Sequence, residues 1–438
     1  MAESDYSMKV LLLGSGAREH TIAWRLLHSP RLTKLWVADG NAGTAAIATN
    51  LPIKPDDIDG IIAAAMSLEI DLVVVGPELP LSLGIVDQLA SLGIAAFGPS
   101  KAAARIETSK SFALEVMKEA NVACPEFWVF QDESSALKFL NGRSGPMVVK
   151  ADGLAAGKGV ILCATAKEAA KAVSVCMNDR AFGEAGDTVV IEEMLTGPEV
   201  SVFAFCDGQQ ISSLAAACDY KRLEDANTGP NTGGMGSFSP PGFWNDDLAH
   251  QVEYDIMRPV VDTMAANGFP YKGVLYAGLM LTPDGPKVLE FNCRLGDPET
   301  QVVLPRLSTD PLDVMLACVD GNLHQVPVVW DDQCYVGVVL ASGGYPGVYQ
   351  TGFVISGAGT DLDDTTLFHA ATRLESDGDA TQLVTSGGRV MTVVGKGDSL
   401  AEAKAKAYDR VRKISFEGVI FRTDIAGVVE ETITWPSR

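Results

Sequence analysis

Polar side chains interrupt an apolar segment near residue 290, and this pattern constrains the fold more than any other. The segment 287–301 has the sequence K-V-L-E-F-N-C-R-L-G-D-P-E-T-Q, and Val288–Cys293 is predicted to be a buried β-strand. Successive side chains on a strand point to opposite faces. Glu290, Asn292 and Arg294 therefore share one face, where a carboxylate, an amide and a guanidinium are costly to bury without partners.

Two interpretations of this face remain open from the segment alone. In one, Glu290 and Asn292 bind a single Mg²⁺, an ion that takes one or two protein ligands and leaves its other positions to phosphates and water. Arg294 then offers parallel donors to a carboxylate or a phosphate. In the other, the strand simply leaves the core there and its charged side chains form a solvated ion pair.

Length and composition describe a multidomain protein that works on small molecules. A chain of 438 residues is long enough for about two to four domains. No apolar run approaches about 18 residues and no signal-peptide pattern precedes Met8, so we expect neither a membrane span nor export. Eight scattered cysteines without a C-x-x-C pair favour reduced thiols in the cytoplasm over disulfides or a zinc site. A formal charge of −22 argues against nucleic acid as a partner, and phosphorylated substrates would need local basic groups.

The first hundred residues are predicted to form a doubly wound α/β unit. Four short apolar runs alternate with helical patterns, as in parallel strands joined by helices: Lys9–Leu13, Leu35–Ala38, Leu72–Val75 and Ile94–Phe97. Ligands of such sheets bind at the carboxyl ends of the strands. Those ends carry glycine-containing turns, namely Gly14-Ser15-Gly16, Asn41-Ala42-Gly43, Gly76-Pro77-Glu78 and Gly98-Pro99-Ser100.

The first of these turns fits a nicotinamide dinucleotide only in part. Gly14 and Gly16 match the G-x-G of that motif, and Asp39 ends the second strand where an acid would bind the ribose. The third glycine position holds Glu19, whose carboxylate would lie close to a pyrophosphate. We therefore expect a smaller ligand, such as one phosphate on the helix N-terminus, with a tight turn that binds nothing as the alternative.

A glycine-rich loop with two lysines follows an apolar strand in the middle of the chain. Met147–Lys150 is predicted as the strand, and the loop continues to Val160 with three glycines and Lys158. Glycines let backbone N–H groups approach phosphate oxygens, and lysines neutralise them. The Walker pattern is absent, so we interpret the loop as a flap over phosphates, with a solvated hairpin as the alternative. Pro99–Asn121 is predicted as one helix that carries Lys110.

Val189–Ser201 is predicted as a strand with a bend at Gly197-Pro198. The backbone of residues 193–195 is placed to meet an adenine edge, and Glu199 to reach ribose hydroxyls. Acidic residues beside a turn are mostly just solvated, so these signals are weak in isolation.

The region Ala215–Gly236 is predicted to be the least regular of the chain. Asp219, Lys221 and Arg222 form a compact charge cluster before a loop too rich in glycine to be a helix. A long loop of this kind in a compact domain is usually functional or disordered.

After residue 330 the pattern changes to glycine-rich β segments and one helix that begins with the capping box Ser399–Glu402. Residues 331–430 are therefore predicted to be a small α+β domain that packs against the nucleotide region and holds no site. The predicted domains are 8–107, 108–330, with a flap subdomain at about 125–195, and 331–430.

In this order the motifs resemble the ATP-grasp superfamily, and within it the phosphoribosylamine–glycine ligases, also called glycinamide ribonucleotide synthetases. Three long segments carry the resemblance: K-A-D-G-L-A-A-G-K-G-V at 150–160, A-N-T-G-P-N-T-G-G-M-G at 226–236 and E-F-N-C-R-L-G-D-P-E-T-Q at 290–301. The resemblance spans Met8 to about Gly427. It implies a multidomain α/β and α+β fold with an N-terminal doubly wound parallel sheet, ATP-grasp nucleotide-binding domains and a small C-terminal α+β domain.

The resemblance also implies a chemistry and the residues for it. The implied enzyme joins glycine to 5-phosphoribosylamine in purine biosynthesis and splits ATP, by way of glycyl phosphate. Its ATP residues would be Lys110, Lys150, Lys158, Glu192, Glu193, Leu195 and Glu199, and Glu290 and Asn292 would hold Mg²⁺ or Mn²⁺. Its substrate residues would be Gly14, Ser15, Gly16, Asn41, Gly43, Glu78, Arg222 and Arg294. Asp219, Lys221 and Arg294 would act in catalysis. We expect a cytoplasmic monomer.

Three residues depart from the pattern of the family. Ala17 stands where glycine is expected, Asp39 where proline is expected and Tyr220 where histidine is expected. Asp39 adds a negative charge beside the implied phosphoribosylamine pocket, and Tyr220 puts a proton-transfer role at that position in question. None of the three is an implied ATP or metal residue.

Other functions remain open at this point. Another ATP-grasp ligase or carboxylase would share the ATP residues and use a different acceptor. A nucleotide-binding oxidoreductase would depend on the Gly14-Ser15-Gly16 turn and Asp39. A non-catalytic binding or scaffold protein would keep the fold and lose the metal ligands, whereas Glu290 and Asn292 are present here.

Overall fold

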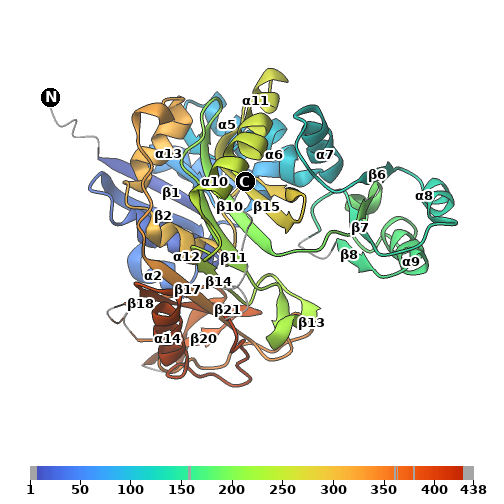
Figure 1. Cartoon of the computed structure of the whole chain (residues 1–438). Helices are drawn as coiled ribbons and strands as arrows, with labels where there is room; N and C mark the ends of the chain where they lie inside the picture. Colours follow the sequence, from blue (N-terminus) through green and yellow to red (C-terminus); the bar gives the residue numbers. More distant parts are fainter. Residues whose placement is uncertain (1–6, 156–158, 360–361, 363, 378–379, 428–438) are drawn as a thin grey trace.

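The computed structural model of the protein describes residues 7–155, 159–359, 362, 364–377 and 380–427. Within these residues, three sheets of four or more strands organise the chain (Figure 1). The first sheet is parallel and confirms the predicted doubly wound unit. Its strand order is β3-β2-β1-β4-β5, with β1 (Met8–Gly14), β2 (Leu32–Asp39), β3 (Thr49–Leu51), β4 (Leu72–Val75) and β5 (Ala95–Phe97).

The central strands β1 and β4 of this sheet have continuous apolar runs, as expected for parallel strands that helices shield. Residues 10–13 of β1 are fully buried. The sequence pattern did not predict β3, which is only three residues long. The helices of this part are α1 (Ala17–Leu26), α2 (Ala42–Ile47), α3 (Ile58–Ser67), α4 (Glu78–Leu83), α5 (Ile85–Ser91), α6 (Lys101–Thr108) and α7 (Lys110–Glu119).

The prediction of a single helix over Pro99–Asn121 is wrong, because the chain breaks between α6 and α7. Ser109 has an extended backbone, with φ −142° and ψ 111°, and its hydroxyl accepts from the backbone N–H of Phe112. A serine that caps the next helix in this way competes with continuation of the previous one. The break places Lys110 in the first turn of α7.

The second sheet is antiparallel and forms a lobe of its own, set apart on the right of the main body in Figure 1. Its strand order is β6-β9-β7-β8, and helices α8 and α9 pack on it around a separate apolar core. The elements are β6 (Phe127–Phe130), α8 (Glu133–Leu140), β7 (Met147–Ala151), β8 (Val160–Cys163), α9 (Ala166–Met177), the 3₁₀ helix η1 (Gly183–Gly186) and β9 (Val189–Glu193).

The strand predicted over Val189–Ser201 is two strands in different sheets. β9 ends in the lobe, and β10 (Glu199–Asp207) begins the central part of the molecule. Gly197 between them has φ +152°, and a Cβ there would lie 2.1 Å from Leu281 O. Only glycine fits this approach to the neighbouring strand, so the predicted bend is the point at which the chain crosses from one sheet to the other.

The third sheet is antiparallel and has eight strands, in the order β16-β15-β10-β11-β14-β17-β21-β18. It continues from the nucleotide region into the C-terminal region through the pairing of β14 with β17. Its other strands are β11 (Ala215–Asp219), β14 (Gly236–Ser239), β15 (Lys272–Thr282), β16 (Gly285–Asn292), β17 (Cys334–Ala341), β18 (Thr365–His369) and β21 (Arg389–Gly397).

The remaining elements surround this sheet. The prediction that Ala215–Gly236 is irregular is wrong, because that region contains β11, the pair β12 (Arg222–Glu224) and β13 (Thr228–Asn231), and the start of β14. A second pair is β19 (Thr372–Asp377) with β20 (Ala380–Thr385). The helices are η2 (Asp225–Asn227), α10 (Asp246–Val252), the π-helical turn η3 (Glu253–Met257), α11 (Arg258–Ala266), α12 (Thr300–Val303), η4 (Leu304–Arg306), α13 (Pro311–Asp320), η5 (Leu323–Gln325) and α14 (Leu400–Val411).

Two findings bear on the compositional expectations. All eight cysteines are free. Over the described residues, no helix combines the length and the apolar character that crossing a membrane requires.

A buried arginine ties the C-terminal segment to the β12–β13 pair. Arg422 has a relative exposure of 1%, and its guanidinium forms a two-pronged ion pair with Asp424, at 2.8 and 2.7 Å. It also donates to Arg222 O and Asn227 Oδ1 and lies 4.5 Å from the ring centroid of Tyr220.

Replacing Arg422 by Leu is expected to destabilise the protein by about 2–4 kcal/mol, because its partly buried and exposed acceptors then lose a buried charged donor and the segment 422–424 loses its tie to the β12–β13 pair. Urea unfolding measures this loss. Arg412→Leu is the control, since Arg412 and its partner Asp409 are both mostly exposed, and we expect a change within about 0.5 kcal/mol. Equal effects of the two substitutions would contradict the role given to Arg422.

Candidate active site

Glu290 and Asn292 lie on β16, at the edge of the eight-stranded sheet. Glu290 is opposite Gly278 and Asn292 is opposite Tyr276 on β15. A Cβ on Gly278 would lie 3.4 Å from the Glu290 Cγ, so the glycine leaves room beside the carboxylate. Among the described residues neither side chain has a direct hydrogen bond or ion pair. Two oxygen donors thus share one face of a strand with no protein partner.

Four cations surround Glu290. Burial alone would raise the pKa of its carboxyl, but together these cations hold that pKa below its ordinary value: Lys221, Lys150, Lys110 and Arg294. The carboxylate is therefore ionised at neutral pH. A charged oxygen ligand with cations around it suits a divalent metal that carries a polyphosphate.

Lys150 connects the lobe to the central sheet. Its Nζ lies 2.6 Å from Glu192 Oε2 and donates to Leu289 O at 2.9 Å. Lys150 and Glu192 are both buried. An ammonium group inside a protein needs such a partner, so the pair fixes Lys150 one residue away from Glu290 along β16.

Lys110 approaches the same place from α7. Its Nζ donates to Gly153 O at 3.1 Å. Burial lowers the pKa of Lys110, and the carboxylate of Glu290 opposes this shift.

The start of the predicted flap is tied to the start of α7. The Asp152 carboxylate accepts from the backbone N–H of Ser111 at 2.5 Å and from the Ser109 hydroxyl at 3.0 Å. Lys158, which was also predicted for this loop, lies outside the described residues.

The residues predicted to surround the nucleotide base lie where the chain passes from the four-stranded sheet of the lobe to the eight-stranded sheet. The carboxylate of Glu192 is bound to Lys150, as above. Glu193 is exposed, with Oε2 4.0 Å from Lys287 Nζ, and Leu195 is half-buried in the connection between β9 and β10.

The predicted charge cluster divides into two parts. Lys221 lies beside Glu199, with 2.5 Å between Nζ and Oε2, and Asp219 ends β11 close to them. The Arg222 guanidinium instead donates to Gly229 O at 2.9 Å within the β12–β13 pair. The structure therefore brings Asp219, Lys221 and Glu199 together and directs Arg222 to the adjoining hairpin.

Burial raises the pKa of the Asp219 carboxyl to about 7, and Glu299 and Glu199 add to the rise while Lys221 opposes it. Burial would lower the pKa of Lys221, but the carboxylates of Asp219 and Glu199 hold it above its ordinary value. An acid that titrates near neutrality beside a permanent cation is typical of a catalytic site.

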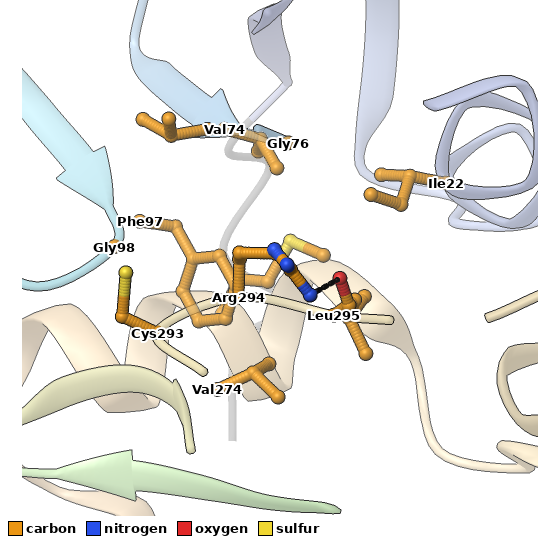
Figure 2. Close-up of a pocket in the computed structure, with 11 residues that line it drawn as sticks. Ile22, Val74, Gly76, Phe97, Gly98, Val274, Cys293, Arg294 and Leu295 are labelled. Atoms are coloured by element: carbon orange, nitrogen blue, oxygen red, sulfur yellow. Dashed lines mark hydrogen bonds between the residues drawn. The ribbon is translucent and has the colours of Figure 1, made fainter. Parts of the chain in front are cut away.

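Arg294 joins the N-terminal sheet to the central sheet, in a small cavity that Val74 and Gly76 also line (Figure 2). Its Nε lies 3.2 Å from Glu78 Oε2, and its Nη2 lies 2.8 Å from Glu107 Oε1. Sequence reasoning missed Glu107, since it lies in the last turn of α6, far from Arg294 in the chain, and belongs to no pattern that marks it. Burial would lower the pKa of Arg294, but Glu107 and Glu78 raise it above its ordinary value.

Glu19 fills the space that a dinucleotide would need at the first turn. Its carboxylate accepts from the backbone N–H of Gly16 at 2.7 Å and pairs with Arg18 at 2.6 Å. A Cβ on Gly14 would lie 2.6 Å from Glu19 Cγ, and one on Gly76 would lie 2.3 Å from Glu19 Oε1. The protein's own carboxylate thus occupies the niche between the two turns, and a phosphate there would need donors other than Gly16. Sequence reasoning did not single out Arg18.

Asn41 and Gly43, predicted to face a substrate, start α2 and have close structural contacts. Asn41 caps that helix through its Oδ1, and Gly43 packs against His20.

Two of the three departures from the family pattern have structural partners. The Asp39 carboxylate lies 3.1 Å from Lys54 Nζ, which compensates its charge. The ring of Tyr220 is buried under Arg422. Ala17 is a buried residue of the first turn of α1.

Glu290 and Asn292 fit a divalent metal although they form no complete cage. The described residues contain no group of three or more His, Cys, Asp or Glu side chains able to hold a metal ion. Mg²⁺ bound with a nucleotide does not need one, because phosphate and water oxygens fill most of its positions. The two hard oxygens without protein partners supply the one or two ligands that remain.

Comparison with known families accounts for this arrangement. Sequence profiles of phosphoribosylglycinamide synthetase match the chain in three consecutive parts: the N domain at residues 8–107, the ATP-grasp (A) domain at 108–300 and the C domain at 335–427. The chain belongs to the phosphoribosylglycinamide synthetase family. The resemblance found in the sequence is thereby confirmed, and the chain is an ATP-dependent ligase of the ATP-grasp type. Enzymes of this type use ATP and divalent metal ions.

Individual relatives agree with the family. Phosphoribosylamine–glycine ligase of Caldanaerobacter subterraneus subsp. tengcongensis is 46% identical over 419 residues, which cover 96% of this chain and 99% of the relative. That of Nostoc sp. is 45% identical over 423 residues, 95% and 99% of the two chains. The crystal structure of phosphoribosylamine–glycine ligase from Thermotoga maritima superimposes with a TM-score of 0.82 at 34% identity and covers 95% of this chain and 99% of that one. A biotin carboxylase from Campylobacter jejuni shares the fold, with a TM-score of 0.70 at 15% identity.

Asp219→Asn tests the raised pKa of that carboxyl. The group titrates near 3.8 when free and near 7 in the folded protein. Between these pH values the folded state holds a proton that the unfolded state has released, so Asp219 lowers stability as pH rises through this window. The variant should therefore gain stability relative to wild type between about pH 4 and pH 7. Urea midpoints of both proteins at the two ends of the window measure this, and a difference independent of pH would contradict it.

Proposed function

We propose that this chain joins glycine to 5-phosphoribosylamine and forms glycinamide ribonucleotide, ADP and phosphate in purine biosynthesis. The observation that carries the proposal is the pair Glu290 and Asn292, whose side chains have no direct partner among the described residues, with the charges of three lysines and Arg294 acting on Glu290. Membership of the family supports the identity of the substrates.

Glu290 and Asn292 hold Mg²⁺, or Mn²⁺ in its place, in this proposal. When bound, the ion neutralises charge on the phosphate oxygens of ATP. Lys110 and Lys150 add positive charge from α7 and β7. The connection from Glu192 to Leu195 lies beside the adenine, and Glu199 beside the ribose.

The first step activates glycine. A carboxylate oxygen of glycine attacks the γ-phosphorus of ATP, an O–P bond forms, and the bond to the bridging oxygen breaks so that ADP leaves. This step is mainly positioning and charge neutralisation. Arg294 has five N–H donors, of which Glu78, Glu107 and Leu295 O engage three. The other two have no acceptor among the described residues, and in this proposal they bind the glycine carboxylate.

The second step makes the amide. The amine of phosphoribosylamine attacks the acyl carbon of glycyl phosphate, a C–N bond forms, and the C–O bond breaks to release phosphate. The attacking nitrogen must lose a proton. Asp219, whose pKa is about 7, is suited to accept it at neutral pH, and Lys221 stabilises the carboxylate form. The turns at Gly14–Gly16 and Asn41–Gly43, with Glu78 and Arg222, face the phosphoribosylamine.

We also propose that the enzyme works in the cytoplasm as a monomer. The free cysteines support a reducing compartment.

Another carboxylate–amine ligase of the same fold is the alternative. It would share the lysines and the metal residues and differ in the acceptor. Following ADP release with glycine and with other small amino acids, each with and without phosphoribosylamine, distinguishes the two.

Glu290→Ala is expected to lower kcat by about 100-fold or more, because the metal loses its charged ligand at the moment of phosphoryl transfer. ADP release at moderate Mg²⁺ measures this, and circular dichroism checks that the variant is folded. Glu224→Ala, an exposed acid on β12, is the control. Near-normal turnover of the Glu290 variant would contradict the proposed metal site.

Glycine labelled with ¹⁸O in its carboxylate tests the acyl phosphate. One labelled oxygen per turnover should appear in the released phosphate, because the C–O bond breaks on the carbon side in the second step. Mass spectrometry of the phosphate measures this. Unlabelled phosphate would rule out the intermediate while leaving the metal site unaffected.

A further inference from the structure

The two turns that face phosphoribosylamine in the proposed function are joined to each other and to the C-terminal region through the side chain of Asn41. Asn41 begins the second turn, and its Nδ2 donates to Ser15 O in the first turn at 2.9 Å and to His369 O at the end of β18 at 2.8 Å. Its Oδ1 accepts from the backbone N–H groups of Gly43 and Thr44. One amide therefore joins the first turn, the second turn and a strand more than 300 residues later.

A histidine pair makes a second connection between the same parts. The backbone N–H of His369 donates to His20 Nδ1 at 2.8 Å, and His20 lies on α1 directly after the first turn. The His20 backbone N–H bonds to Gly16 O at 3.0 Å. Because Nδ1 accepts, the proton of the neutral ring is on Nε2. The main chain of His369 thus both donates to α1 and accepts from the second turn.

Close packing leaves little freedom at this junction. A Cβ on Gly43 would lie 2.3 Å from His20 Cε1 and 2.8 Å from His369 Cβ. The His20 ring also meets Phe368 edge-on, with 5.8 Å between centroids. Glycine is required at position 43 by these contacts, quite apart from any ligand.

We propose that His20 and His369 are positioning residues for phosphoribosylamine: through them the C-terminal region locks the turns Gly14–Gly16 and Asn41–Gly43 in the shape that binds this substrate. The proposal rests on the proposed function. Neither histidine needs to touch the substrate. Loops fixed before binding lose less entropy when the ligand arrives, so the lock acts on affinity for the ligand that those turns hold.

The charge state of the pair agrees with this role. Burial lowers the pKa of His20 to about 3, with a contribution from His369, whose own pKa burial lowers to about 4. His369 is the titratable group that faces His20 from β18. His20 is therefore neutral, and its Nδ1 stays an acceptor, throughout the neutral range.

Two substitutions at His20 separate the hydrogen bond from the packing. His20→Asn keeps an acceptor close to the position of Nδ1, whereas His20→Leu fills similar space without one. The KM for phosphoribosylamine, formed in the assay from ribose 5-phosphate and ammonia, should rise about tenfold in H20L, the loss expected for one hydrogen bond. It should stay within about threefold of wild type in H20N. The KM for ATP and kcat at saturation should be unchanged in both. H28L, the same change at an exposed position in the turn just after α1, is the matched control.

The outcomes distinguish the lock from the proposed function. A wild type that forms no glycinamide ribonucleotide overturns the proposed function, and this proposal with it. Product formation with the same KM for phosphoribosylamine in H20L and H28L overturns the lock alone, as does an equal rise in the KM for ATP.

A second variant decides the question if H20L does not fold. Asn41→Asp keeps the acceptor that caps α2 and removes the donor to Ser15 and His369. It should also raise the KM for phosphoribosylamine about tenfold and leave the KM for ATP unchanged. An unchanged KM for phosphoribosylamine in N41D would overturn the proposal.

Discussion

The candidate active site depends on keeping one half-buried carboxylate, that of Glu290, ionised and without a direct partner among the described residues. A carboxylate away from water is costly unless charge nearby compensates it. Glu290 is compensated by cations held near it, and these cannot collapse onto it because other groups fix them, in the pairs Lys150–Glu192, Lys221–Glu199 and Arg294–Glu107. The Glu290 oxygens therefore stay available for a metal, while the field around them suits a triphosphate.

Those cations come from segments far apart in the chain, on the lobe and on the eight-stranded sheet, so the site exists only when these parts are assembled. Lys150 is on the lobe, Lys221 follows a central strand, and Arg294 follows β16 and reaches the N-terminal sheet through Glu78. Strand β16 lies at the edge of its sheet, which lets elements of the other two sheets approach its polar face. The crossing at Gly197 is what brings the lobe close to that edge.

Patterns within single strands predicted the site residues that those strands carry. Period-two alternation placed Glu290 and Asn292 on one face, and the apolar strand ending in Lys150 indicated a buried cation. The pairing of Arg294 with Glu107 was not predictable, since Glu107 lies 187 positions away and has no motif of its own. The break at Ser109 and the β12–β13 pair were missed because a single capping hydroxyl and tertiary contacts overrode composition.

The C-terminal region was predicted to hold no site, and the cations that act most strongly on Glu290 come from the region before it in the chain. Its contribution is mechanical. Because β17 pairs with β14, the region is continuous with the sheet that carries Glu290 and Asn292, and His369 at the end of β18 contacts Asn41 in the second turn of the N-terminal sheet and His20 on α1. One continuous sheet thus connects the place where glycine would be activated to the turns that would hold its acceptor. A reactive acyl phosphate is useful only if its acceptor is already in position. This continuity therefore gives the C-terminal region a role in positioning the acceptor as well as in stability.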